Sequence, residues 1–131
     1  MHTNTPYQTN LFRISAIFNI TIGLALLFNH QWFFTLFGYE ITAEDAYLAF
    51  IQVAGIAIAS FGVGYYWASK DFQKNSGLIQ LGAIAKIGVF AVFLSIYIQN
   101  SNILPLFIAG SLDLTFAALF FIELKKINKN S

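Results

Sequence analysis

The chain has 131 residues, of which 57% are hydrophobic, 18% aromatic and 10% charged. Soluble domains carry about 25% charged residues and use them to cover their surface, so water is not the main solvent of this protein. The lack of cysteine excludes disulfides, thiol redox chemistry and thiolate nucleophiles. A net charge of +1 without a basic cluster excludes a nucleic-acid footprint. We therefore predict a single membrane domain over residues 1–131.

Four segments are long and apolar enough to cross a bilayer as helices. A hydrocarbon core about 30 Å thick needs roughly 20 apolar residues per helix. The candidate spans cover about residues 11–29, 46–68, 78–99 and 104–124. They lack period-two alternation, so helices are favoured over barrel strands. An aromatic cluster rather than a cleavage site follows the first span, and we expect that span to be retained.

The connections predict how the spans are ordered. "SKDFQKNSG" and "QNSN" are short and turn-forming, which makes consecutive spans antiparallel neighbours. The outer connection 30–45 is aromatic and then acidic. We expect an interfacial turn or short helix there, before Thr42 caps the second span; a docking surface for a partner or lipid is the alternative. The predicted fold class is all-α: an integral-membrane, up-down-up-down four-helix bundle.

The basic residues predict the orientation. With both termini on one side, the outer loops 30–45 and 100–103 contain no lysine or arginine. The side of the termini receives Arg13, Lys70, Lys74, Lys125, Lys126 and Lys129. By the positive-inside rule both termini are expected to be cytoplasmic, which corresponds to a multi-pass protein of the bacterial inner membrane.

Two ionisable residues lie well inside the predicted spans. Lys86 is about eight residues, or roughly 12 Å, from the cytoplasmic end of span three, and Asp113 is about 11 residues, or roughly 16 Å, from that end of span four. Each would cost about 2.5–3.5 kcal/mol alone at a helix centre. We therefore predict that Lys86 and Asp113 form an ion pair inside the bundle. The pair could serve only to set helix register, or it could be a functional site.

Further polar and small residues follow helical spacing on the faces predicted to point inward. The polar candidates for a ligand-binding site around the ion pair are Asn19, Gln52 and Tyr66. The small residues expected to pack helix against helix are Gly23, Gly55, Ala59, Gly62, Gly82 and Gly110. Interhelical hydrogen bonding explains Asn19 and Gln52 without a ligand. A polar pocket for a headgroup or small amphiphile is the other possibility.

Chemistry beyond binding has little support in the residues. His2 and His30 are solitary and lack a second ligand at metal-binding spacing, so no metal or cofactor is expected. An intramembrane enzyme would use Asp113 or Lys86 as acid or base, but the chain shows no nucleophile with an aligned base and no phosphate-binding loop. We lean against catalysis.

Residues 68–120 carry a resemblance to a known group. "ASKD", "GAIAKIGVF" and "AGSLDLTFAALF" resemble segments of small bacterial four-span membrane proteins, which have an A-R-D-like loop, a G-x-x-x-K segment and a G-D-L-x-F-A-x-L-F segment. The resemblance implies the same bundle and marks Lys86 and Asp113 as the typical charged positions. Here "GSLDL" stands where many members have a shorter G-D-L. A looser similarity to DoxX-like proteins adds only the fold.

Two functional interpretations follow. The first is a structural, assembly or interaction subunit that contacts membrane lipids and forms a homo-oligomer or binds another membrane protein. The alternative is binding or transport of a lipid-like ligand, small amphiphile or proton-coupled solute through the polar site around Lys86 and Asp113, with conduction requiring an oligomer or a path along the pair.

Overall fold

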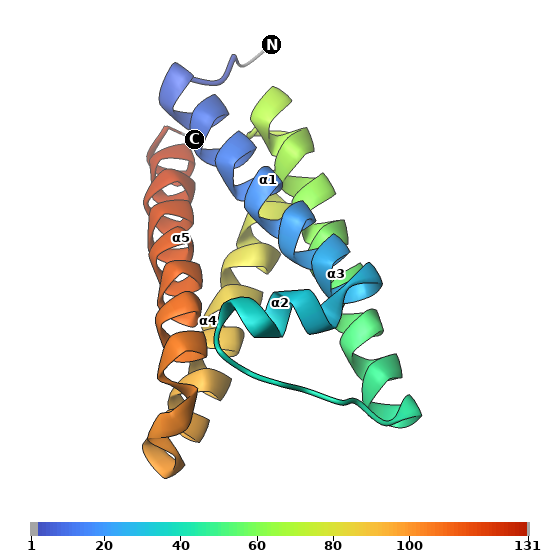
Figure 1. The fold of residues 1–131 in the computed structure, drawn as a ribbon. Helices are drawn as coiled ribbons and strands as arrows, with labels where there is room; N and C mark the ends of the chain where they lie inside the picture. The colour runs from blue at the N-terminus through green and yellow to red at the C-terminus, as the bar shows by residue number, and fades with distance from the viewer. Residues whose placement is uncertain (1–2, 131) are drawn as a thin grey trace.

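The computed structural model describes residues 3–130, so His2 lies outside the described residues. Its helices are α1 (Pro6–Phe28), α2 (His30–Leu36), α3 (Asp45–Lys70), α4 (Ser76–Gln99) and α5 (Leu104–Lys129), with a short 3-10 turn, η1 (Ser101–Ile103), before α5. Helices α1, α3, α4 and α5 are long and apolar enough to cross a membrane. They run alternately up and down, and α1 begins at the same end of the bundle at which α5 ends (Figure 1). The all-α four-helix bundle is thus confirmed, and the chain is a multi-pass membrane protein.

Helix α1 starts earlier than predicted, at Pro6, because its N-terminus is capped. The Thr5 hydroxyl accepts from the Gln8 amide at 3.2 Å, and the Gln8 side chain accepts from the Thr5 amide at 3.0 Å. This capping box satisfies two amides that would otherwise lack partners. These capping residues lie in a polar segment, so a prediction based on apolar residues places the start of the helix too late.

The N-terminal segment also holds the far end of α3. Asn4 donates to the Ala68 carbonyl oxygen at 2.8 Å, and its side-chain oxygen accepts from the Phe72 amide at 2.8 Å. Phe72 is 2% exposed, so this amide has no ready access to water. The two bonds connect the start of α1 to the turn that leaves α3.

Replacing Asn4 therefore tests how firmly this end of the bundle is held. Asn4→Ala removes both bonds and leaves the Phe72 amide unsatisfied, which we expect to lower the free energy of unfolding by about 1–3 kcal/mol. The matched control is Asn10→Ala on the exposed side of α1, where no side-chain hydrogen bond is found. Unfolding in a mixed-micelle denaturant titration, followed by helical circular dichroism, measures both. Equal stability of the two variants would contradict the expected role of Asn4.

The outer connection contains the short helix that was predicted as one option. Helix α2 lies crosswise at the end of α1, in the half of the bundle farther from the termini, and α3 and α5 extend beyond it (Figure 1). Gly38, at φ 82°, ends it: its amide bonds to Thr35 and the Tyr39 amide bonds to Phe34, both at 3.0 Å. The backbone has a left-handed conformation at this position, and glycine adopts that conformation without strain.

The prediction that Thr42 caps the second span is wrong. The N-cap of α3 is Glu44, which makes no side-chain capping bond, and the helix begins at Asp45. The chain before it is extended and is tied instead to the α4–α5 connection, because the Tyr39 hydroxyl donates to the Asn102 carbonyl at 2.8 Å. This bond joins positions 63 apart in the sequence, so helical spacing does not predict it.

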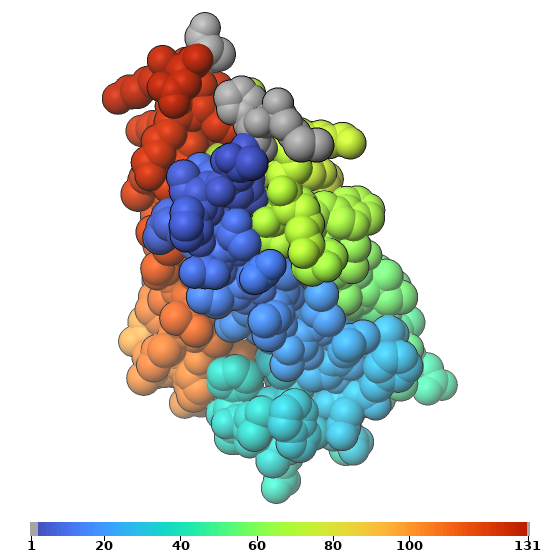
Figure 2. All heavy atoms as spheres, turned by 90° about the horizontal axis from the view of Figure 1, so that it is seen from above, coloured from blue at the N-terminus to red at the C-terminus, as the bar shows by residue number. Residues whose placement is uncertain are grey.

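The bundle is built from two closely packed helix pairs, α1 with α3 and α4 with α5, while α3 and α4 contact less extensively. In the space-filling view α1 lies between α5 and α3 (Figure 2). The main hydrophobic core lies in the half nearer the termini. Its buried members are Leu11, Phe12, Ala16, Tyr65, Ala68, Phe72, Ile79, Ala83, Ala117 and Phe120. The ion pair therefore lies at the edge of this core that is farther from the termini.

Candidate functional site

Lys86 and Asp113 meet inside the bundle. The Lys86 ammonium donates to one oxygen of the Asp113 carboxylate, with a distance of 2.6 Å between Nζ and Oδ1. Lys86 on α4 is 4% exposed, whereas the Asp113 side chain on α5 is 20% exposed. The antiparallel α4–α5 pair brings the two residues to the same depth. The carboxylate is thus the more accessible half of a largely buried pair.

Asn19 extends the ion pair to the other two helices. Its side-chain oxygen accepts from the Lys86 ammonium at 3.0 Å, and its amide group donates to the Ile58 carbonyl of α3 at 3.3 Å. Asn19 lies on α1 and is 6% exposed. One chain of polar contacts therefore connects all four spanning helices. Such networks are strong only when each buried member is satisfied, and the described residues leave no buried side-chain nitrogen or oxygen without a partner.

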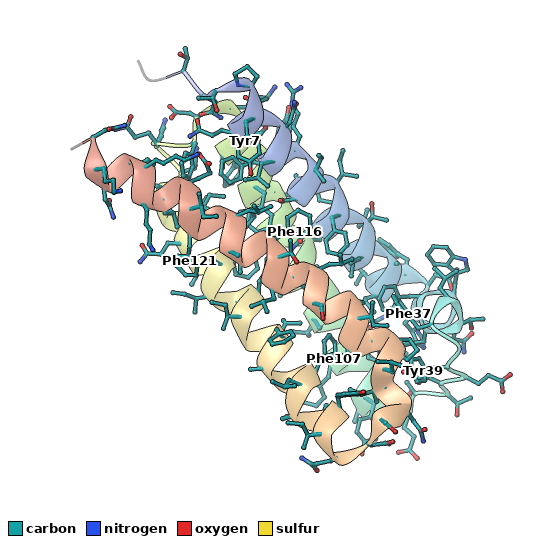
Figure 3. All side chains as sticks on the ribbon, turned by 90° about the vertical axis from the view of Figure 1, so that its left-hand side faces the viewer. Tyr7, Phe37, Tyr39, Phe107, Phe116 and Phe121 are labelled. Atoms are coloured by element: carbon teal, nitrogen blue, oxygen red, sulfur yellow. The ribbon has the colours of Figure 1, made fainter. Side chains whose placement is uncertain are left out.

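Three aromatic rings complete the surroundings of the ammonium. Lys86 Nζ lies 5.6 Å from the ring centre of Phe18, 5.6 Å from that of Tyr65 and 5.3 Å from that of Phe116. Figure 3 shows Phe116 on the side of α5 that faces α1, and its ring lies 5.4 Å from Phe18. Ring faces attract a cation within about 6 Å, most strongly where water is excluded. The ammonium is therefore stabilised by an anion, an amide oxygen and three rings.

Small residues allow this arrangement. A Cβ atom at Gly82 would collide with the Tyr65 hydroxyl, and one at Gly110 would lie 2.5 Å from the Phe93 ring. Gly82 thus makes room for a ring that faces Lys86, and Gly110 lets α4 and α5 approach beside Asp113. Close helix approach at small residues is the usual packing mode in membranes.

The other predicted glycines hold α1 against α3. A Cβ at Gly23 would lie 2.5 Å from the Gly55 carbonyl oxygen, and one at Gly62 would lie 2.6 Å from the Ile20 side chain. Ala59 contributes to the same crossing, 2.6 Å from the Cβ position of Gly23. These positions are filled by the chain's own helices. They are not free for contact with a second copy.

Two of the predicted polar residues are not brought to the ion pair. Gln52 donates to the Leu27 carbonyl at 3.4 Å, which ties α3 to the outer end of α1. Tyr66 is 47% exposed and lies under the Lys70 ammonium, 5.2 Å away. The tyrosine that reaches the site is Tyr65. Both tyrosines fit three-or-four spacing from Gly62, so sequence spacing alone could not choose between them.

Phe18 and Phe116 were not singled out from the sequence either. The chain has 15 phenylalanines, and nothing in their spacing separates the two that face the ammonium from those that face lipid. A further buried charge, Glu123, was likewise not singled out as a site residue. Glu123 is 1% exposed, accepts from Gln8 at 2.9 Å and pairs with Lys126 at 2.5 Å. It ties the start of α1 to α5 at the end where the termini lie.

The chemistry available at the ion pair is binding and proton exchange. Among residues 3–130 no group of three or more histidine, cysteine, aspartate or glutamate side chains is placed to hold a metal ion. The ammonium is engaged on several sides, while the partly exposed carboxylate is the group that a small cation or proton could reach.

Comparison with protein-family models finds no match for this chain, and comparisons with curated proteins and with solved structures find none either. The class of the protein therefore rests on its own residues: a four-span helical membrane protein with a buried lysine–aspartate pair at its centre.

Proposed function

We propose that the protein is a structural, assembly or interaction subunit of a bacterial inner membrane, with both termini cytoplasmic, and that it acts without catalysis. The observation that carries the proposal is the saturation of Lys86 by groups of its own chain: Asp113, Asn19 and three aromatic rings. A site built for an external ligand would keep its strongest charge available. Here that charge holds four helices in one register, and what remains for other molecules is the outer surface.

Three further features support the proposal. The basic residues outside the spans gather near the termini, as the positive-inside rule requires of a cytoplasmic side. The spanning helices expose large apolar side chains to the surroundings, for example Ile17, Ile56 and Ile84. The resemblance to small bacterial four-span proteins, loosely DoxX-like, adds the compartment. Contact with a second copy would use these outer sides, since the glycines of the α1–α3 crossing are already filled.

Site-directed cross-linking tests the assembly role. The chain has no cysteine, so one can be introduced on the exposed side of each spanning helix: Ile17→Cys, Ile56→Cys, Ile84→Cys and Ile122→Cys. In membranes of a bacterial host that carries the protein, we expect cross-linked products at one or two of these positions. Ala83→Cys, at a site that is 0% exposed, is the control that should give none. A chain that forms no product with itself or another membrane protein at any of the four sites would refute the proposal.

A second function is favoured by one observation, the 20% exposure of the Asp113 side chain. In this alternative the carboxylate binds a small amphiphilic or cationic ligand, or passes protons. Liposomes that enclose a pH-sensitive dye and contain either the parent protein or Asp113→Asn separate the two functions. The alternative requires a proton flux that the substitution removes, and the assembly role predicts equal, background-level flux in both.

A further inference from the structure

A groove lies between the start of α4 and the end of α5, at the end of the bundle where the termini lie. Its volume is about 300 Å³. Its apolar side is formed by Phe121, Leu124 and Ile127, and the polar side chains that line it are Ser76, Gln80, Lys125 and Asn128. Phe121 lies on the side of α5 that faces α4 (Figure 3). One wall can therefore hold a charged group while the other holds hydrocarbon.

Three of the four polar side chains that line this groove are uncommitted. In the described part of the chain, Ser76, Gln80 and Lys125 make no side-chain hydrogen bond or ion pair. A neighbouring pocket of about 170 Å³ differs, because its Gln8 and Lys126 are both bonded to Glu123. Among the described residues, the cation of the α4–α5 groove is thus unpaired, whereas the cation of the neighbouring pocket is paired.

The charge of the groove favours an anion. None of the described residues that line it is acidic, and Lys125 contributes a full positive charge. The first turn of α4 begins there at Ser76, without a capping bond from the Asn75 side chain, so the positive end of the helix dipole also faces this region. Basic pockets between spanning helices on the cytoplasmic side bind anionic lipid headgroups.

The surroundings of the groove favour a ligand that has a hydrocarbon part. Leu81 on α4 and Ile122 on α5 follow directly in the sequence on the lining residues Gln80 and Phe121, and they are 53% and 51% exposed. Both helices that form the groove therefore also expose apolar side chains to acyl chains. A soluble anion would leave the Phe121 and Leu124 side uncovered, whereas a phospholipid covers both sides at once.

We propose that this groove binds one phospholipid with an anionic headgroup. The phosphate lies between the Lys125 ammonium and the first turn of α4, where Ser76 and Gln80 can donate hydrogen bonds, and an acyl chain lies along Phe121 and Leu124. This binding does not depend on the assembly role, and either can fail without the other.

Lipid titration of the full chain in nonionic detergent tests the site. The probes are short-chain phosphatidylglycerol and phosphatidylcholine with identical acyl chains, and binding is counted by native mass spectrometry. We expect tighter binding of the anionic lipid to the parent. Lys125→Gln should weaken that binding about fivefold or more, since a lysine near an anionic headgroup contributes about a factor of five. Lys129→Gln, a cation of the same helix outside the groove, should change it less than about twofold.

Further variants address folding and the source of the phosphate. Lys125→Arg keeps the charge and should keep the binding, which shows that a loss in Lys125→Gln is not caused by misfolding. Ser76→Ala combined with Gln80→Leu should weaken both lipids, because these side chains donate to the phosphate, which phosphatidylcholine also carries. Equal losses in Lys125→Gln and Lys129→Gln, or equal affinities for the two lipids, would overturn the proposal. So would competition by inorganic phosphate or glycerol phosphate as strong as that of the lipid, which would indicate a soluble ligand.

Discussion

Asp113→Leu is expected to lower the free energy of unfolding by about 3–5 kcal/mol, which is the typical cost of removing one partner from a buried ion pair. The Lys86 ammonium would keep Asn19 and its aromatic neighbours, but it would remain 4% exposed without an anion. Lys86→Met leaves the Asp113 carboxylate unpaired instead. Because the Asp113 side chain is 20% exposed, it can recover some hydration, and we expect a smaller loss than in Asp113→Leu.

The double variant, Lys86→Met with Asp113→Leu, is the decisive comparison. Apolar replacement of both partners of a buried pair is often neutral or stabilising, so we expect the double variant to lie within about 1 kcal/mol of the parent. Denaturant titration in mixed micelles, with helical circular dichroism as the signal, measures all four proteins, and the cycle yields the coupling energy. Losses in the single variants that simply add in the double variant would show that the two side chains are not coupled.

The same double variant connects stability with function. If it folds and gives the cross-linked products of the parent, the pair acts by holding helix register, as the assembly role requires. If it folds but loses those products, the polar centre takes part in the interaction itself.

Gly23→Ala is expected to destabilise the protein by about 3 kcal/mol, at the upper end of typical overpacking costs. The new methyl group would lie 2.5 Å from the Gly55 carbonyl oxygen and 2.6 Å from the Ala59 amide nitrogen. Both are backbone atoms of α3, so no side-chain rotation relieves the contact. The α1–α3 crossing must therefore open, and because Asn19 lies one turn away on α1, its bond to Lys86 should weaken as well.

Gly88→Ala is the matched control for this packing effect. Gly88 lies inside α4, and a Cβ placed there meets nothing within 4 Å. Alanine favours the helix over glycine by about 0.5–1 kcal/mol, so this variant should be unchanged or slightly more stable. Thermal unfolding in the same detergent compares the two. A Gly88→Ala variant as unstable as Gly23→Ala would show that loss of glycine as such, and not the crossing, causes the effect.

Much of the fold follows from the residues alone, for a physical reason. Lipid forces each spanning segment to satisfy its backbone internally, so an apolar run of sufficient length becomes a helix whatever its neighbours are. Short connections then make successive helices antiparallel. The approach of Lys86 to Asp113 follows from the same two facts, because depth along two antiparallel helices can be counted in the sequence and lone charges are costly.

Only the tertiary structure decides how each helix is rotated about its own axis and which residues of other helices it contacts. Sequence spacing allowed Tyr65 or Tyr66 to face inward, and the close packing at Gly82 placed Tyr65 there while Tyr66 remained 47% exposed. The aromatic cage around Lys86 arises where three helices meet, so no single helical pattern contains it. Gln52 shares the small-residue face of α3, but it bonds to Leu27 near the outer end of α1, because it lies six residues before Ile58, the α3 residue that Asn19 contacts. A sequence specifies which residues lie on one face of a helix, but the neighbour met by each part of that face depends on how the helices cross.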